Sequence, residues 1–213
     1  IWNKMYHKTL DYARKGVLVA SISAIDIAIM DLKGKTLGLP VSNIIGGAHR
    51  KKVQPYATGM YFSDLKNPSK NFQKEAEKYI DMGFRAIKMK VGLGIKQDFH
   101  NIKLMREIIG NDIMLMIDSN HAYNYSEALS LAKKIEQFDI SWFEEPLSPE
   151  YYEQYAELRK NTIIPIAAGE CEYLRFGFLQ LLKNKSIDIL QPDICSCGGI
   201  TEAKKIAAIA SSY

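Results

Sequence analysis

The chain has 213 residues, of which 47 % are hydrophobic and 24 % are charged, and its 28 basic and 24 acidic side chains leave a net charge of +4. This composition is that of a soluble globular protein, long enough for one domain or one domain and part of another. The small, scattered positive excess argues against nucleic-acid binding, and no apolar run reaches the roughly 20 residues that span a membrane. An odd number of cysteines and no signal peptide favour a reduced, cytoplasmic protein.

The first 48 residues differ in pattern from the rest of the chain. The segment from Lys8 to Lys35 is rich in Ala, Ile and Leu, and it indicates one helix that stops at the glycine- and proline-containing segment 34–40. We expect residues 1–48 to form a helical element that precedes the main domain, 49–213. The basic run 49–52, which starts with His49, is interpreted as a solvated loop.

From residue 53 onward, short apolar runs alternate with longer amphipathic ones. The apolar runs predict strands at 53–59, 86–91, 113–120, 141–145, 165–170 and 188–192, and the amphipathic runs predict helices near 68–82, 96–109, 126–138, 151–160, 176–183 and 201–212. Strict alternation implies a parallel sheet, either open and doubly wound or closed into a (β/α)8 barrel. No Gly-x-Gly-x-x-Gly follows a strand, which counts against a dinucleotide-binding sheet.

Five successive predicted strands each end in an ionisable side chain. These residues are 23 to 28 positions apart, and they are Lys90, Asp118, Glu144, Glu170 and Asp193. In a barrel the carboxyl ends of the strands meet at the face that holds the active site. A single acid there is usually a helix cap, but three converging carboxylates repel each other, and a divalent cation relieves that repulsion. All-oxygen ligation favours magnesium, calcium or manganese over zinc.

The motifs around these residues form an ordered set. They are Lys88-x-Lys90, Asp118, Glu144 within Phe-Glu-Glu-Pro, Glu170 within Gly-Glu, and Pro192-Asp193 followed by Gly198-Gly199. This set resembles the mandelate racemase branch of the enolase superfamily, and segment 24–40 is similar to the helix that ends the capping domain of that family. The resemblance covers essentially the whole chain. It implies an incomplete TIM-type barrel of about six βα units, preceded by the last helical part of an α+β capping domain.

The resemblance also implies roles for the residues at the strand ends. Three carboxylates would bind Mg²⁺, and they are Asp118, Glu144 and Glu170. Lys90 would remove the proton α to a substrate carboxylate, Lys88 would contact that carboxylate, and Asn120 would lie near the substrate. Asp193 would orient a histidine that follows a seventh strand, which this chain lacks. His121 is either an acid in the reaction or a loop histidine without a role in proton transfer. Mg²⁺ would stabilise the ene-diolate, as this superfamily is known to do.

The expected reaction is the Mg²⁺-dependent elimination of water from a sugar acid, which makes the protein a dehydratase, a lyase. A racemase or epimerase of a 2-hydroxy acid would share the same enolate chemistry and stays open, because the second acid is missing from the chain. More distant alternatives are a Schiff-base aldolase, which needs no carboxylate cluster, and an inactive fragment. The expected partner is a small anionic carboxylate, with no nucleic acid and no membrane. We expect a homo-oligomer for the full-length protein.

Overall fold

The computed structural model describes residues 1–12, 14–48, 50–62, 64 and 66–213, so His49 and its part of the predicted loop lie outside the described residues. Two compact units emerge from the contacts within the chain. The first contains Ile1–Val53, Gly169–Lys183 and Leu190–Tyr213, and the second contains Gln54–Ala168 and Asn184–Ile189. The predicted division of the chain at residue 48, between capping element and barrel, stays a prediction.

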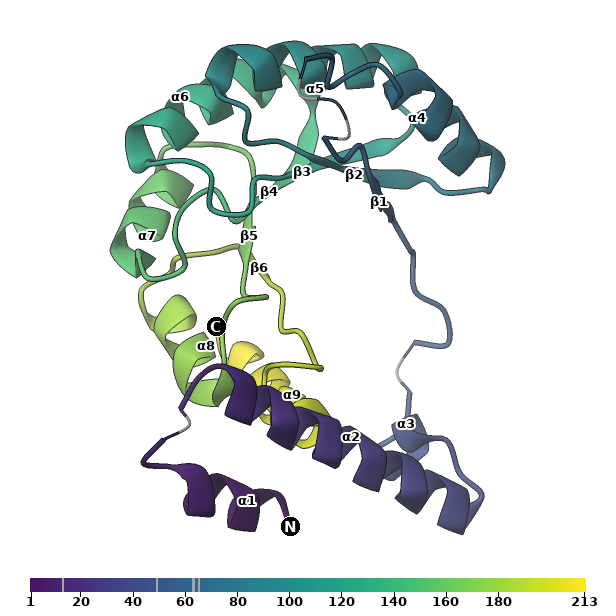
Figure 1. Cartoon of the computed structure of the whole chain (residues 1–213), viewed down its shortest axis with the longest axis vertical. Helices are drawn as coiled ribbons and strands as arrows, with labels where there is room; N and C mark the ends of the chain where they lie inside the picture. Colours follow the sequence, from purple (N-terminus) through teal and green to yellow (C-terminus); the bar gives the residue numbers. More distant parts are fainter. Residues whose placement is uncertain (13, 49, 63, 65) are drawn as a thin grey trace. The chain divides into compact units, whose positions relative to one another are not determined.

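The strands form a parallel sheet (Figure 1). They are β1 (Ala57–Gly59), β2 (Ala86–Lys90), β3 (Met114–Asp118), β4 (Ile140–Glu144), β5 (Ile166–Ala168) and β6 (Ile189–Leu190), in the order β1-β2-β3-β4-β5-β6. The pairings from β1 to β5 are all parallel. Each strand is added on the same side of the one before it, which is the order of a barrel, whereas a doubly wound sheet reverses its direction partway. The predicted fold class is therefore confirmed.

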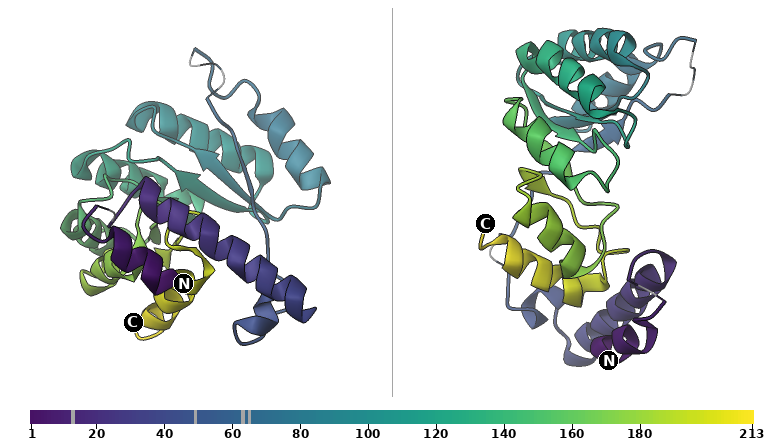
Figure 2. Two further views of the ribbon diagram at one scale, coloured as in Figure 1. Left: turned by 60° about the horizontal axis from the view of Figure 1, so that its bottom comes forward. Right: turned by 90° about the vertical axis from the view of Figure 1, so that its left-hand side faces the viewer.

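In the second unit, helices pack against one face of the sheet (Figure 2). They are α4 (Phe72–Asp81), α5 (Ile95–Ile109), α6 (Tyr125–Ile135) with the 3-10 helix η1 (Glu136–Phe138), and α7 (Tyr152–Lys160). Strand side chains such as Leu115, Ile117 and Phe143 are fully buried, as expected for a sheet packed under helices. Side chains alternate along a strand, so the neighbours of these residues in the sequence point to the opposite face of the sheet, away from the helices.

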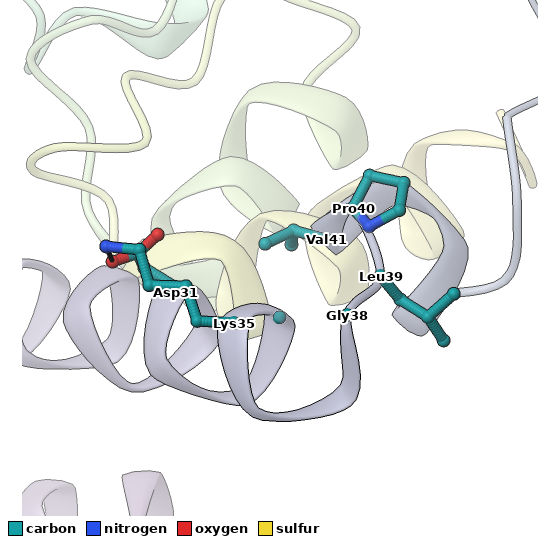
Figure 3. A pocket seen from close by; sticks show the side chains of 7 residues that line it. Asp31, Lys35, Gly38, Leu39, Pro40 and Val41 are labelled. Carbon is teal, nitrogen blue, oxygen red and sulfur yellow. Dashed lines mark hydrogen bonds and ion pairs between the residues drawn. The ribbon is translucent and has the colours of Figure 1, made fainter.

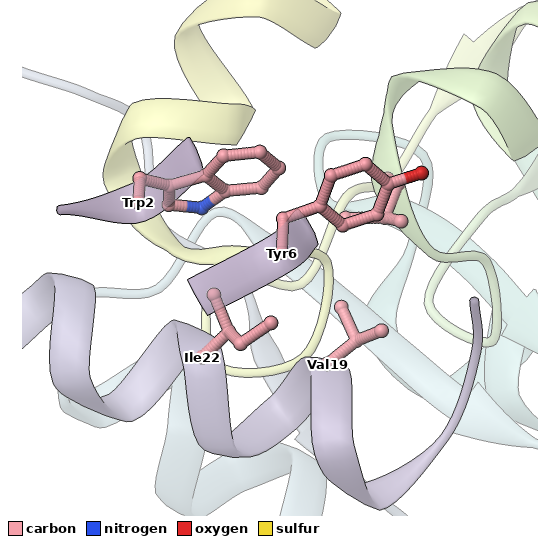
Figure 4. Packing of buried hydrophobic residues seen from close by; sticks show 5 residues of the cluster. Trp2, Tyr6, Val19 and Ile22 are labelled. Carbon is pink, nitrogen blue, oxygen red and sulfur yellow. The ribbon is translucent and has the colours of Figure 1, made fainter. Parts of the chain in front are cut away.

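The first unit is helical. Its helices are α1 (Trp2–Thr9), α2 (Val17–Leu37), α3 (Val41–Ile44), α8 (Leu174–Lys183) and α9 (Gly199–Ala210). A buried cluster of side chains from α1, α2 and α8 stabilises it (Figure 4), and its members are Trp2, Tyr6, Val19, Ile22 and Leu174. None of the described helices is long and apolar enough to cross a membrane.

The single helix predicted from Lys8 to Lys35 is wrong at its amino-terminal end and is confirmed from Val17 onward. The structure ends α1 at Thr9 and begins α2 at Val17, directly after Gly16. Gly16 has a φ of +80°, a left-handed conformation that glycine adopts at little cost. Composition does not report where the backbone turns, so it did not predict this break.

Candidate active site

The register of the sheet aligns three of the predicted site residues. Lys90 on β2 pairs with Asp118 on β3, and Asp118 pairs with Glu144 on β4. Paired positions in neighbouring strands project their side chains to the same face, and here that face is opposite to Ile117 and Phe143. The carboxyl ends of β2, β3 and β4 therefore carry a lysine and two carboxylates in one row, as the sequence predicts.

Two ammonium groups neutralise the two carboxylates. Lys88 Nζ donates to Glu144 Oε1 at 2.6 Å and lies 3.6 Å from Asp118 Oδ2. Lys90 Nζ lies 2.5 Å from the same Asp118 oxygen. Asp118 and Glu144 are each only 1 % exposed, so each carboxylate would be costly to bury without a positive partner. Without a nearby cation this pair of acids would be unstable.

The charge state of Lys88 follows from this environment. Burial lowers its pKa, but the hydrogen bond to Glu144 and the negative charges of Glu144 and Asp118 act in the opposite direction. The net result is that the pKa of Lys88 lies above its ordinary value. The charged form of Lys88 is therefore favoured beside Asp118 and Glu144, and such a cation can attract an anionic ligand.

Lys90 is held by the loop that follows β3. Asn120 Oδ1 accepts a hydrogen bond from Lys90 Nζ at 2.6 Å, and the backbone N–H of Asn120 donates to Asp118 Oδ1 at 3.1 Å. Asn120 has a φ of +42°, in the left-handed region that asparagine tolerates better than most residues. The ring of Tyr61, after β1, lies 5.7 Å from Lys90 Nζ. These contacts set the position of the lysine amine.

His121 lies beside the second glutamate of the Phe-Glu-Glu-Pro motif. Its Nε2 is 3.4 Å from Glu145 Oε2, and its backbone N–H donates to the Glu145 carbonyl at 2.9 Å. Glu145 is 1 % exposed, and the His121 side chain is 30 % exposed. Both residues have positive φ, +66° for His121 and +41° for Glu145, and such outliers concentrate at functional sites. The role of His121 as an acid stays a prediction.

The remaining predicted residues belong to the first unit. Glu170 is exposed and comes two positions after the last residue of β5, next to Gly169, which has a φ of +134°. Asp193 is also exposed, and its carboxylate accepts hydrogen bonds from the Cys195 N–H at 2.9 Å and the Ser196 hydroxyl at 3.1 Å. The metal-binding role of Glu170 and the dyad role of Asp193 stay predictions.

Two aromatic residues that lie beside the lysines, Tyr56 and Trp142, were assigned no role from the sequence. Trp142 Nε1 donates to Glu144 Oε2 at 3.0 Å, and the ring of Tyr56 meets the Trp142 ring edge-on, with centroids 5.4 Å apart. Lys88 Nζ lies 5.4 Å from the centroid of Tyr56. The alternation of side chains along a strand does place Trp142 on the same face as Glu144, because the two residues are two positions apart.

The first unit contains a pocket whose lining residues differ from the predicted site residues (Figure 3). It has a volume of about 270 Å³ at the carboxyl end of α2, and its lining includes Asp31, Lys35, Gly38, Leu39, Pro40 and Val41. Its charged groups form an exposed ion pair, Asp31 with Lys35 at 2.7 Å. The predicted catalytic and metal-binding residues are not among those lining it, so we do not assign it to the site.

Comparison with known proteins agrees with the fold. Residues 71–213 match the family described as "Enolase C-terminal domain-like". Residues 1–46 match "Mandelate racemase / muconate lactonizing enzyme, N-terminal domain". The two matched segments together include nearly every element that the structure describes.

Among curated proteins, a D-galactarolactone cycloisomerase from Agrobacterium fabrum is 42 % identical over 214 residues, which cover 100 % of this chain and 56 % of that protein. An arabinonate dehydratase from Saccharolobus solfataricus is 37 % identical, with 99 % of this chain and 56 % of that protein covered. The chain thus spans little more than half the length of these relatives.

Solved structures of similar proteins share the fold of this chain. The crystal structure of the 3,6-anhydro-D-galactonate cycloisomerase from Zobellia galactanivorans has a TM-score of 0.93 and 56 % identity, with 100 % of this chain and 59 % of that chain covered. A racemase from Streptomyces coelicolor, solved with bound magnesium, has a TM-score of 0.93 and 32 % identity, with 99 % and 62 % covered.

Proposed function

We propose that this chain, which belongs to the mandelate racemase/muconate lactonizing enzyme family of the enolase superfamily, carries the base and the metal ligands of an enzyme that acts on sugar acids. The reaction begins with removal of the proton α to a carboxylate and continues with loss of an oxygen from the β-carbon. The observation that carries the proposal is the row of Lys90, Asp118 and Glu144 at one edge of the sheet.

The donor set fits magnesium. Two of the three proposed ligands, Asp118 and Glu144, are buried, lie at paired positions of neighbouring strands and share the ammonium group of Lys88. Glu170 would complete an all-oxygen set, which hard divalent cations prefer. When bound, Mg²⁺ would supply Lewis-acid stabilisation of the negative charge that develops on the substrate carboxylate.

Lys90 is the proposed base. To accept a proton, its amine must first be neutral, which means that its ion pair with Asp118 must be replaced. That exchange requires another cation beside Asp118, so the proposed metal and the proposed base depend on each other. Lys88, which lies beside both proposed ligands, would bind the substrate carboxylate. Asn120 keeps the Lys90 amine in place through the 2.6 Å contact.

The departing oxygen needs a proton donor. We propose that Asp193 orients a histidine from the part of the protein that follows this chain and stabilises its protonated form. His121, paired with Glu145, is the second candidate for this acid. Asp193 and His121 lie in different compact units of the chain, so separate substitutions of these two residues can test the two candidates.

Two outcomes of the elimination are supported. The first is dehydration of an open-chain sugar acid, the reaction named for the arabinonate relative. The second is opening of a ring whose oxygen is attached to the β-carbon, and it is favoured by 56 % identity to a 3,6-anhydro-D-galactonate cycloisomerase. Dehydration releases water, whereas ring opening conserves the mass of the substrate. Mass spectrometry of the product from arabinonate, galactarolactone and anhydrogalactonate, each with Mg²⁺, separates the two.

The α-proton step has its own test. In the full-length protein in deuterated water, Lys90→Ala should slow exchange of the substrate α-proton by about 100-fold or more, the usual contribution of a general base. Lys103→Ala is the control, because Lys103 is half-exposed on α5 and pairs only weakly with Glu107 at 3.8 Å. Undiminished exchange in the Lys90 variant would place the base elsewhere.

A further inference from the structure

The indole of Trp142 contacts a proposed metal ligand directly. Its Nε1 donates to Glu144 Oε2 at 3.0 Å, while Lys88 donates to the other oxygen, Oε1, at 2.6 Å. Each donor therefore bonds to a different oxygen of the Glu144 carboxylate. Because an indole N–H can only donate, Trp142 itself cannot bind a metal, and its influence must pass through Glu144.

The position of the indole is itself constrained. Trp142 and Glu144 are two residues apart on β4, so they share a face of the sheet. Tyr56 packs edge-on against the indole, with an interplanar angle of 79°. This contact limits the rotamers of Trp142 and therefore the direction of its N–H. A phenylalanine would keep most of this packing and lose only the donor.

The consequence concerns the orientation of Glu144. A carboxylate rotates freely about its last bond unless its oxygens have fixed partners, and here Lys88 and the indole of Trp142 each hold one oxygen. The indole N–H therefore restricts this rotation by holding Oε2 of Glu144. Hydrogen bonds of this kind to metal ligands typically strengthen metal affinity by about 10- to 100-fold.

We propose that Trp142 is a positioning residue for the metal ligand Glu144 and that its indole N–H reports on metal occupancy. This inference rests on the proposed Mg²⁺ site, and it adds a residue that acts on the metal only through its ligand. The proposed ligands are all protein carboxylates, so Mg²⁺ binding can be measured without substrate.

The test is calorimetric titration of Mg²⁺ into the full-length protein and two matched variants. Trp142→Phe should weaken Mg²⁺ binding by about 10-fold or more, with the fold checked by circular dichroism. Trp2→Phe is the control, since Trp2 also donates its indole N–H, to the Gly198 carbonyl at 2.7 Å, but lies in the other compact unit. The control should bind Mg²⁺ as the parent protein does.

The outcomes separate this inference from the proposed function. Equal Mg²⁺ affinity in parent and Trp142→Phe overturns the positioning role and leaves the metal site standing. No Mg²⁺ binding in the parent protein overturns the proposed metal site itself. If Trp142→Phe does not fold, the indole N–H resonance of Trp142 in ¹⁵N-labelled protein decides. It should shift along the calorimetric binding curve, and a resonance that does not respond refutes the inference.

Discussion

Replacing Asp26 by alanine should destabilise the helical unit by about 2 to 4 kcal/mol. Asp26 lies on α2 and is 4 % exposed. Its Oδ2 accepts from the Thr201 backbone N–H at 2.8 Å and its Oδ1 accepts from the Thr201 hydroxyl at 2.6 Å. Thr201 lies in the first turn of α9, whose N-cap residue is Gly198 and has no side chain. A residue 175 positions away therefore caps this helix.

The magnitude follows from the contacts that are lost. Each hydrogen bond to an ionised acceptor contributes about 1.5 to 3 kcal/mol, and a negative charge at a helix amino terminus adds about 0.3 to 1 kcal/mol. Relief of the cost of burying the Asp26 carboxylate offsets part of this sum. Asp26→Asn keeps an acceptor for the Thr201 N–H but loses the charge, so its effect should be intermediate.

Equilibrium urea denaturation of the full-length protein measures these differences, and amide exchange at Thr201 localises them. The control is Asp31→Ala on the same helix, because Asp31 pairs with Lys35 in an exposed ion pair worth only about 0.3 to 0.5 kcal/mol. Exchange of the Thr201 amide should accelerate in the Asp26 variants alone. If Asp26→Ala is no less stable than Asp31→Ala, the capping account of α9 is wrong.

Three further substitutions test contacts within the second unit. Burial and the hydrogen bond to Glu75 raise the pKa of Tyr79 to about 12, so its contribution to stability is present below pH 10 and lost as the pH rises from about 10 towards 12. Ultraviolet titration of the phenols should show this late ionisation, and Tyr79→Phe should remove it. Gly59→Ala would place a methyl group against Glu75 Oε1 and 2.7 Å from the Tyr79 hydroxyl, the two groups that form the hydrogen bond, and should cost about 1 to 3 kcal/mol in urea denaturation. It should also lower the pKa of Tyr79 by pushing the phenol away from Glu75, and an unchanged Tyr79 titration would contradict this. Arg106 donates to four backbone carbonyls, and they are those of Gly110, Ile113, Phe138 and Asp139. A lysine cannot reach all four, so Arg106→Lys should lose about 2 to 4 kcal/mol, and a fully stable variant would show that these bonds are redundant.

The predicted strands match the six described strands in order, but all except 141–145 are too long, and 141–145 begins one residue after β4 does. The segment 53–59 narrows to Ala57–Gly59, and 165–170 narrows to Ile166–Ala168. An apolar run shows that a segment is buried, but the length of a strand depends on how far its neighbour runs alongside it. Between β3 and β4 the register also shifts between Leu115 and Ile117, a feature that no periodicity reports.

Parity and spacing along the chain account for the relative positions of three predicted site residues. Lys90, Asp118 and Glu144 lie in one row, because regular βα units bring equivalent strand ends to the same edge. The contacts among their side chains were not predictable in the same way. That Trp142 holds Glu144 depends on rotamers and on the packing of Tyr56, which are set by neighbours distant in the chain.

The sequence by itself determined the parallel α/β class, the family and the row of ionisable strand ends, because hydrophobic period and motif spacing are local properties of the chain. Only the tertiary structure decided that Lys88 neutralises Glu144, that Gly16 separates α1 from α2, and that Asp26 caps α9. Each of these depends on the direction of a backbone turn or on contact between residues far apart in the chain, and neither is encoded in a periodic pattern.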